Sequence, residues 1–359
     1  MLREIKQTVL RASRASGVFS LVSRSRWRQN RLLILGYHGV ALEDEHQWNP
    51  GLYITQELFA ERMDALARLG CNVLALGEAL ERLRAGQLPE RSVAITFDDG
   101  FYDFYKLAYP IIKQHKFPVT LYLTTYYASY NRPVFDVICS YLIWKGSGKV
   151  VDASNLIGEG VTLDLTSEAG RALSLNAVKK FAQAAALSAE EKDALASSLA
   201  RLVGVDYEEI LEKRILHLLK PEEVRELAED GVDIQLHTHR HRTPQKRELF
   251  LREIEDNRHA IEKMANVRAT HFCYPSGHFR TEFLPWLEEA EVASATTCGL
   301  GFATQETNKF ILPRLLDRSH MTDVEFEGWV TGLSNFLPKR AENYEDVEEE
   351  QGGIRKTEG

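Results

Sequence analysis

The segment Val93-Ala94-Ile95-Thr96-Phe97-Asp98-Asp99-Gly100 decides the fold, because an apolar run ends abruptly in two carboxylates and a glycine. Such a run predicts a buried strand, and the glycine allows the chain to turn sharply after it. Adjacent carboxylates repel each other unless their roles are divided, as when one binds a metal ion and the other acts as a base. An isolated Asp-Asp pair more often starts a helix, so the interpretation depends on the rest of the chain.

A second strand-like run ends in the polar segment Gln235-Leu236-His237-Thr238-His239-Arg240-His241. Three histidines within five positions can converge on one cation. With one carboxylate, two imidazoles form a ligand set that leaves coordination positions open for water and substrate. The alternative is a solvated, histidine-rich loop, which is the weaker interpretation in a chain with only 11 histidines.

Together, Thr-Phe-Asp-Asp-Gly and His-Thr-x-x-His resemble the first two motifs of the polysaccharide deacetylases, the NodB-homology group of carbohydrate esterases. The resemblance runs from about Leu32 to about Leu316. It implies an α/β fold, a distorted (β/α) barrel, and metal-dependent removal of acetyl groups from sugars. By position it implies Asp98 as the general base, with Asp99, His237 and His241 as metal ligands. His239 falls on a variable position of the motif and is not assigned to the metal.

The third motif of this family has an arginine at the position of Cys273 in Cys273-Tyr274-Pro275-Ser276-Gly277. The Tyr-Pro-x-Gly pattern resembles the branch that includes poly-N-acetylglucosamine deacetylases, in which the motif order is partly permuted. In that branch the catalytic histidine comes from a Tyr-His pair near the N-terminus, which implies His38 as the general acid. His320 is the alternative acid, because the unpermuted family places its last histidine near that position.

Two further site predictions follow from the third motif. Arg314 is the candidate replacement for the missing arginine, because it follows a strand predicted at Phe310–Leu312. Pairing of Arg314 with a surface carboxylate is the alternative. Tyr274 and Ser276 are predicted to face the substrate, with the Ser276 backbone N–H as a donor to the oxyanion of a tetrahedral intermediate.

These residue types suit the hydrolysis of an amide. A bound divalent cation lowers the pKa of its water towards ~7, Asp98 can accept the proton of the attacking water, and His38 can protonate the leaving amine. Zinc is the expected metal, and cobalt or nickel would fit the same ligands.

Strand-like runs alternate with helical patterns along the chain, which predicts a largely parallel sheet. The predicted strands are Leu32–Tyr37, Asn72–Leu76, Val93–Phe97, Val119–Leu123, Val232–Leu236, Thr270–Tyr274, Ala293–Thr297 and Phe310–Leu312. The candidate residues His38, Asp98 and His237 each follow the C-terminal end of a strand. Barrel enzymes build their active sites at that end.

The chain of 359 residues divides into four predicted parts. A basic amphipathic segment covers residues 1–31, a deacetylase barrel covers 32–335, and an acidic, disordered tail covers 336–359. Within the barrel, residues 126–220 break the strand–helix rhythm and predict a mostly helical insertion on the active-site side. Its aromatic residues either line a glycan groove or form the core of the insertion.

Charge is distributed unevenly between the N-terminal segment and the rest of the chain. Residues 1–31 carry eight basic residues and one acid, a net charge of +7, although the whole chain has −8. We expect peripheral contact with an anionic inner-membrane surface, which would suit a lipid-linked substrate. The alternative is a solvated helix packed on the barrel.

Composition indicates which cellular location and which classes of binding partner are expected. The sequence shows no apolar run long enough to span a bilayer and no signal-peptide core. Four cysteines without a Cys-x-x-Cys pair favour reduced thiols and a cytoplasmic location. The acidic balance argues against nucleic acid as a partner.

Three functional classes are consistent with these motifs. The leading one is a metal-dependent deacetylase that hydrolyses N-acetyl groups of N-acetylhexosamine units in an exopolysaccharide or its lipid-linked precursor. An O-acetyl carbohydrate esterase is the close alternative. A carbohydrate-binding protein that keeps the fold without turnover is the third, and the missing motif arginine is the feature that favours it.

Overall fold

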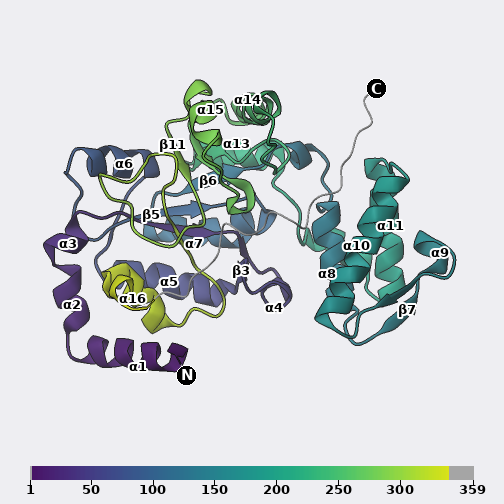
Figure 1. The fold of residues 1–359 in the computed structure, drawn as a ribbon, viewed down its shortest axis with the longest axis horizontal. Helices are drawn as coiled ribbons and strands as arrows, with labels where there is room; N and C mark the ends of the chain where they lie inside the picture. The colour runs from purple at the N-terminus through teal and green to yellow at the C-terminus, as the bar shows by residue number, and fades with distance from the viewer. Residues whose placement is uncertain (1, 339–359) are drawn as a thin grey trace.

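Parallel strands form one curved sheet surrounded by helices in the computed structural model, which describes residues 2–338 (Figure 1). Residues 339–359 of the predicted acidic tail lie outside this range. The strands of the sheet are β1 (Leu33–Tyr37), β4 (Asn72–Val73), β5 (Ser92–Phe97), β6 (Thr120–Leu123), β9 (Asp233–Leu236), β10 (His271–Cys273), β11 (Ser294–Thr296) and β12 (Leu315–Leu316). Their order is β11-β10-β9-β6-β5-β1-β12, and β4 pairs with β5.

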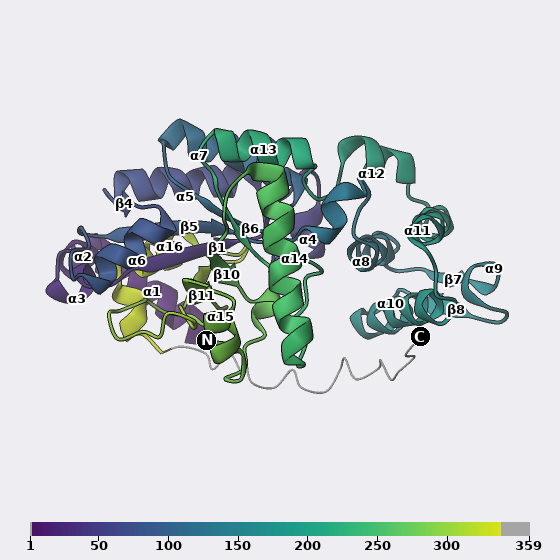
Figure 2. The same cartoon turned by 90° about the horizontal axis from the view of Figure 1, so that it is seen from above.

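Helices surround the sheet, which confirms the predicted barrel-type α/β fold. They are α5 (Gln56–Arg68), α6 (Leu76–Arg84), α7 (Tyr109–His115), α13 (Pro221–Glu229), α14 (Arg247–Ala265), α15 (Phe283–Glu289) and α16 (Asp323–Thr331). A single π-helical turn, η1 (Phe104–Ala108), precedes α7. Figure 2 shows α5, α7 and α13 lying together along one side of the sheet.

Side chains alternate between the two faces of the central strands. On β5, Val93, Ile95 and Phe97 belong to the large core beneath the helices, whereas Ala94 belongs to a separate cluster inside the barrel. Because successive residues of a strand point to opposite faces, Thr96 and Asp98 continue the inner face of Ala94. The same alternation on β1 and β9 directs His38 and His237 inward.

One predicted strand is wrong. Residues 310–312 form only an isolated bridge, Thr296↔Leu312, and the last strand is instead β12, paired with β1. Pro313 lies between the two segments and has no N–H to continue a ladder. Residues 310–316 therefore run from the edge at β11 to the edge at β1 and close the barrel, with Arg314 between the two contacts.

Residues 126–220 contain a separate group of elements on the right of Figure 1, beyond α4 (Glu45–Trp48) and β3 (Tyr53–Ile54). They comprise η2 (Tyr126–Ser129), α8 (Phe135–Lys145), β7 (Val150–Asp152), α9 (Ser154–Ile157), β8 (Thr162–Asp164), α10 (Glu168–Ala184), α11 (Ala189–Val203) and α12 (Tyr207–Lys213). These helices have their own hydrophobic core, which also includes Tyr53 and the partly buried Trp48 of the barrel. A capping box formed by Ser188 and Glu191 starts α11.

The basic N-terminal segment forms α1 (Leu2–Ala15), α2 (Val18–Ser23) and α3 (Arg26–Gln29). Leu10 and Phe19 are buried against Val324 of α16. Ile5 and Val9 remain 55% and 42% exposed. Within residues 2–338, none of the helices has both the length and the apolar character needed to cross a bilayer.

Candidate active site

Asp98 lies at the inner end of β5 and is held by Arg314 through two parallel hydrogen bonds. Arg314 Nη1 donates to Asp98 Oδ1 and Nη2 donates to Oδ2, each at 2.7 Å. Both side chains are almost fully buried. Burial alone would raise the pKa of Asp98, but the charge and hydrogen bonds of Arg314 outweigh it and lower this pKa to about 2. Asp98 is therefore ionised and fixed in orientation.

The chain fixes Arg314 from several sides. Its Nε donates to the Thr297 carbonyl at 3.0 Å, and its Nη1 also reaches the Thr96 hydroxyl at 3.2 Å. Its Nη2 lies 3.1 Å from the Cys273 sulfur, which in turn lies 3.5 Å from Asp98 Oδ2. Cys273, which stands at the position of the family's motif arginine, therefore contacts both Arg314 and Asp98. The alternative that Arg314 pairs with a surface carboxylate is wrong.

His38 contacts the same carboxylate. Its Nε2 lies 3.5 Å from Asp98 Oδ2. Burial lowers the pKa of His38 below its ordinary value, and the nearby carboxylates only partly oppose this. The rival His320 is exposed in a turn, and its backbone carbonyl accepts a hydrogen bond from Arg3. In residues 2–338 no contact links the His320 side chain to Asp98.

Asp99, His237 and His241 converge on one point beside Asp98. Asp99 Oδ1 lies 3.1 Å from His237 Nε2 and 3.1 Å from His241 Nε2. Asp99 adopts a left-handed φ of 70°, which turns it out of the strand and away from the direction of Asp98. Burial opposes ionisation of Asp99, yet the two histidines hold its pKa well below its usual range.

This triad fits a divalent metal ion. Ligands about 2.0–2.2 Å from one ion lie roughly 3–3.5 Å apart in a tetrahedral site, and the observed separations from Asp99 agree. His237 Nδ1 bonds to the Cys273 carbonyl at 2.8 Å, so this nitrogen carries the proton and Nε2 is left as the ligand atom. Asp98, His237 and Cys273 form a second cluster of potential ligands. Arg314 already donates to two members of that second cluster, which disfavours a cation there.

Two buried polar residues of α14 support the histidine segment, and the sequence reasoning missed both. The Asn257 side chain accepts from the His237 backbone N–H at 2.9 Å and donates to the Leu123 carbonyl at 2.9 Å. Glu253 accepts from the Arg240 backbone N–H at 2.8 Å. Both interrupt the buried face of α14 four residues apart, and this pattern of polar residues among apolar ones was the signal available in the sequence.

Tyr274 is not placed where the sequence analysis expected it. Its ring is buried, its hydroxyl donates to the Phe310 carbonyl at 3.1 Å, and its N–H bonds to the Thr296 carbonyl. Both donors are therefore used within the fold. Ser276 is exposed at φ 56°, and its N–H has no acceptor among residues 2–338. Of the two, Ser276 keeps a backbone donor for a ligand.

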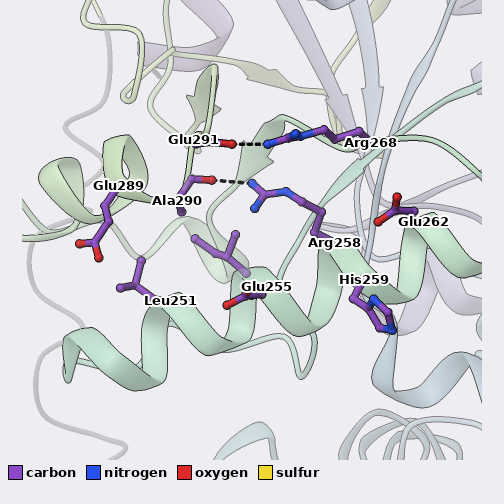
Figure 3. Close-up of a pocket in the computed structure, with 10 residues that line it drawn as sticks. Leu251, Glu255, Arg258, His259, Glu262, Arg268, Glu289, Ala290 and Glu291 are labelled. Atoms are coloured by element: carbon purple, nitrogen blue, oxygen red, sulfur yellow. Dashed lines mark hydrogen bonds and ion pairs between the residues drawn. The ribbon is translucent and has the colours of Figure 1, made fainter.

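One cavity of the described residues lies away from these side chains. It measures about 430 Å³ and is bordered by α14 and by the turn after α15 (Figure 3). Arg258 crosses it to donate to the Ala290 carbonyl at 2.7 Å, and Arg268 pairs with Glu291. None of its lining residues belongs to the constellation around Asp98.

Two named N-deacetylases match part of this sequence. The poly-beta-1,6-N-acetyl-D-glucosamine N-deacetylase of Escherichia coli (strain K12) is 29% identical over 100 residues, which cover 28% of this chain and 15% of that protein. The protein of the same name from Staphylococcus aureus (strain MSSA476) is 30% identical over 112 residues, 28% of this chain and 38% of that protein. The matched stretch thus spans less than half the length of either relative.

Solved structures of low sequence identity share the fold. The Streptococcus pyogenes deacetylase PplD, in complex with acetate, superposes with a TM-score of 0.55 at 17% identity, covering 86% of this chain and 99% of that one. IcaB from Ammonifex degensii gives a TM-score of 0.51 at 16% identity, covering 84% and 97%.

The family assignment comes from the sequence model of the polysaccharide deacetylases. It matches residues 85–295, which is more than half of the chain and includes Asp98, Asp99, His237 and His241. His38 and Arg314 lie outside the matched range, yet the fold brings both to Asp98. The chain belongs to the polysaccharide deacetylase family.

Proposed function

We propose that this protein is a metal-dependent hydrolase that removes N-acetyl groups from N-acetylhexosamine units of an exopolysaccharide or its lipid-linked precursor. The observation that carries the proposal is the position of the clamped Asp98 carboxylate, directly beside the Asp99–His237–His241 triad and in contact with His38. The names of the relatives from Escherichia coli and Staphylococcus aureus support the same substrate class.

Asp99, His237 and His241 would hold the metal, and we propose zinc, with cobalt or nickel compatible with the same ligands. A divalent cation bound there would supply Lewis acidity towards the acetyl carbonyl and the attacking water. Cys273 supports this set indirectly, because its carbonyl fixes the ring of His237.

Asp98 acts as the general base. Its carboxylate is ionised throughout the physiological range, and Arg314 fixes the direction of its lone pairs. A proton from the attacking water passes to Asp98 Oδ2, while the water oxygen forms the new bond to the acetyl carbon. The Ser276 N–H is a candidate donor to the oxygen that gains negative charge.

His38 delivers the proton to the leaving amine. Because its pKa is lowered, His38 is neutral at neutral pH and can take up the proton that Asp98 has accepted, across the 3.5 Å between Nε2 and Oδ2. Transfer of that proton to the amide nitrogen accompanies cleavage of the C–N bond, which releases a free amine and acetic acid, and the acid then ionises to acetate by losing the second proton of the water. His38 therefore receives its proton during the reaction and does not carry it before the substrate binds.

Acetate release tests the proposal. Purified protein loaded with zinc is incubated with β-1,6-linked N-acetylglucosamine oligomers and, separately, with an O-acetylated sugar. We expect release from the oligomers that Asp98→Asn and chelation both abolish. Release from the ester alone would move the assignment to O-deacetylation. Binding of oligomers without any release would favour a carbohydrate-binding protein.

We further propose that the N-terminal helices contact the anionic inner face of a membrane from the cytoplasmic side. Ile5, Val9 and Leu21 are exposed large apolar residues on a segment rich in arginine, and Arg11 and Arg24 of the same segment are also exposed. Sedimentation with vesicles containing anionic lipid tests this. Binding that is lost at high salt and in the variant R11E/R24E is expected, and equal binding to neutral vesicles would contradict it.

A further inference from the structure

A short helical turn of tyrosines is attached to the segment that carries the proposed metal ligands. It is η2, which follows β6. The Tyr126 N–H donates to the His239 carbonyl at 2.8 Å, and the Thr125 hydroxyl lies 2.8 Å from His239 Nδ1. His239 stands between His237 and His241 in the sequence. The tyrosines are therefore anchored beside the proposed catalytic centre.

The aromatic rings form a row that leads away from this segment. The Tyr126 ring meets the His239 ring edge to face, with centroids 5.4 Å apart, and the Tyr130 ring lies 5.7 Å from that of Tyr126. The guanidinium of Arg240 lies over the Tyr126 ring at 5.1 Å. Tyr130, the outer member of the row, is 45% exposed.

These tyrosines have no share in a hydrophobic core. Neither Tyr126 nor Tyr130 belongs to any of the buried clusters found within residues 2–338. By contrast, Tyr141 and Trp144 of the same insertion pack within its core, near Trp48. Tyr141 and Trp144 therefore follow the core interpretation of the insertion's aromatics, whereas the Tyr126 and Tyr130 rings lie outside the core clusters.

The charges around the row balance. Arg240 and Arg242 both pair with the buried Glu253, at 3.3 and 2.7 Å, and Arg240 also lies 3.6 Å from Asp256. The surface thus combines aromatic faces with guanidinium N–H donors but has little net charge. This combination fits a neutral, hydroxyl-rich ligand better than an anionic one.

We propose that Tyr126, Tyr130, Arg240 and Arg242 form a binding subsite for a neutral N-acetylhexosamine unit that neighbours, in the same glycan chain, the unit losing its acetyl group. This inference rests on the proposed function. The tyrosine rings stack on the apolar C–H face of the sugar, and the arginines donate to its hydroxyl and acetyl oxygens. The subsite selects for an oligomer over a single sugar.

Isothermal titration with a β-1,6-linked N-acetylglucosamine pentamer tests the subsite. The zinc-loaded full chain carries Asp98→Asn, so that the probe is not consumed. Adding Tyr130→Ala is expected to weaken pentamer binding about tenfold, or about 1.4 kcal/mol, whereas Tyr130→Phe keeps the ring and stays within about twofold. Leu173→Ala removes another exposed apolar side chain, on α10, and is the control.

The outcomes separate the subsite from the proposed reaction. Pentamer binding that Tyr130→Ala leaves unchanged, or no pentamer binding by any variant, would overturn the subsite whatever the activity. The expected loss of binding, together with no acetate release by the protein that retains Asp98, would preserve the subsite and reject the proposed function. Thermal unfolding of each variant shows whether Tyr130→Ala retains the native fold.

Discussion

The family motif places a positive charge at position 273, and in this chain Arg314 of the closing segment 310–316 supplies that charge instead. The exchange is possible because Cys273 and Arg314 approach Asp98 from neighbouring parts of the same barrel interior, with Arg314 Nη2 only 3.1 Å from the cysteine sulfur. The smaller Cys273 leaves room for the guanidinium. The arginine that pairs with Asp98 can therefore come from a different position in the sequence while Asp98 keeps its own.

Replacing Arg314 by lysine tests this pair. A single ammonium cannot donate to both Asp98 oxygens in parallel, so we expect kcat/KM for acetate release to fall by about 100-fold or more. Arg252→Lys, at an exposed position, is the control and should match the parent protein. Near-parental activity of Arg314→Lys would show that the bidentate geometry is dispensable.

The pH dependence of the reaction tests the state of His38. Burial places its folded pKa below 6.5, so the neutral form already predominates at pH 7 and a further rise in pH does not change it. We expect kcat/KM at pH 8 to stay within about twofold of its value at pH 7. A tenfold decline over that interval would instead require a protonated histidine in the resting enzyme.

At the scale of elements, the closing segment 310–316 needs space beside β1. A Cβ added to Gly36 would lie 2.5 Å from Leu316 Cδ2 and 3.3 Å from Arg314 Nη1. Gly36→Ala is therefore expected to destabilise the protein by about 1–3 kcal/mol and to lower kcat by displacing Arg314. Thermal unfolding and acetate release measure the two effects. Gly301→Ala, whose Cβ would make only ordinary contacts, should change neither.

The sequence was most informative where strand periodicity and local motifs agree. The apolar runs before His38, Asp98 and His237 predicted strands whose ends meet, and those three side chains do face one barrel interior. It failed at Phe310–Leu312, because an apolar run cannot reveal which edge it will join or where Pro313 interrupts pairing. Tyr274 was misplaced for a similar reason, since alternation fixes a face but not whether the hydroxyl finds a partner inside the fold.

For the whole molecule, metal binding should be visible as stability. A ligand that binds only the folded state at about 100 times its Kd adds about 2.7 kcal/mol, which raises the melting temperature by several degrees in a chain of this size. Asp98→Asn should lose activity but keep this zinc-dependent increase, whereas His237→Ala should lose both. Differential scanning calorimetry with and without zinc distinguishes the two variants. An equal increase in His237→Ala would place the metal elsewhere.

The closure of the barrel also sets the order in which the site can mature. Asp98 precedes Arg314 by 216 residues, so during synthesis the carboxylate exists long before its counter-charge has left the ribosome. Until then the sheet lacks the segment that joins β11 to β1, and the aspartate has no guanidinium to direct it. The site therefore becomes able to hydrolyse substrate only when the last strand docks, at the end of folding. Before that, a nascent chain holds the complete histidine segment, but no guanidinium fixes the orientation of Asp98.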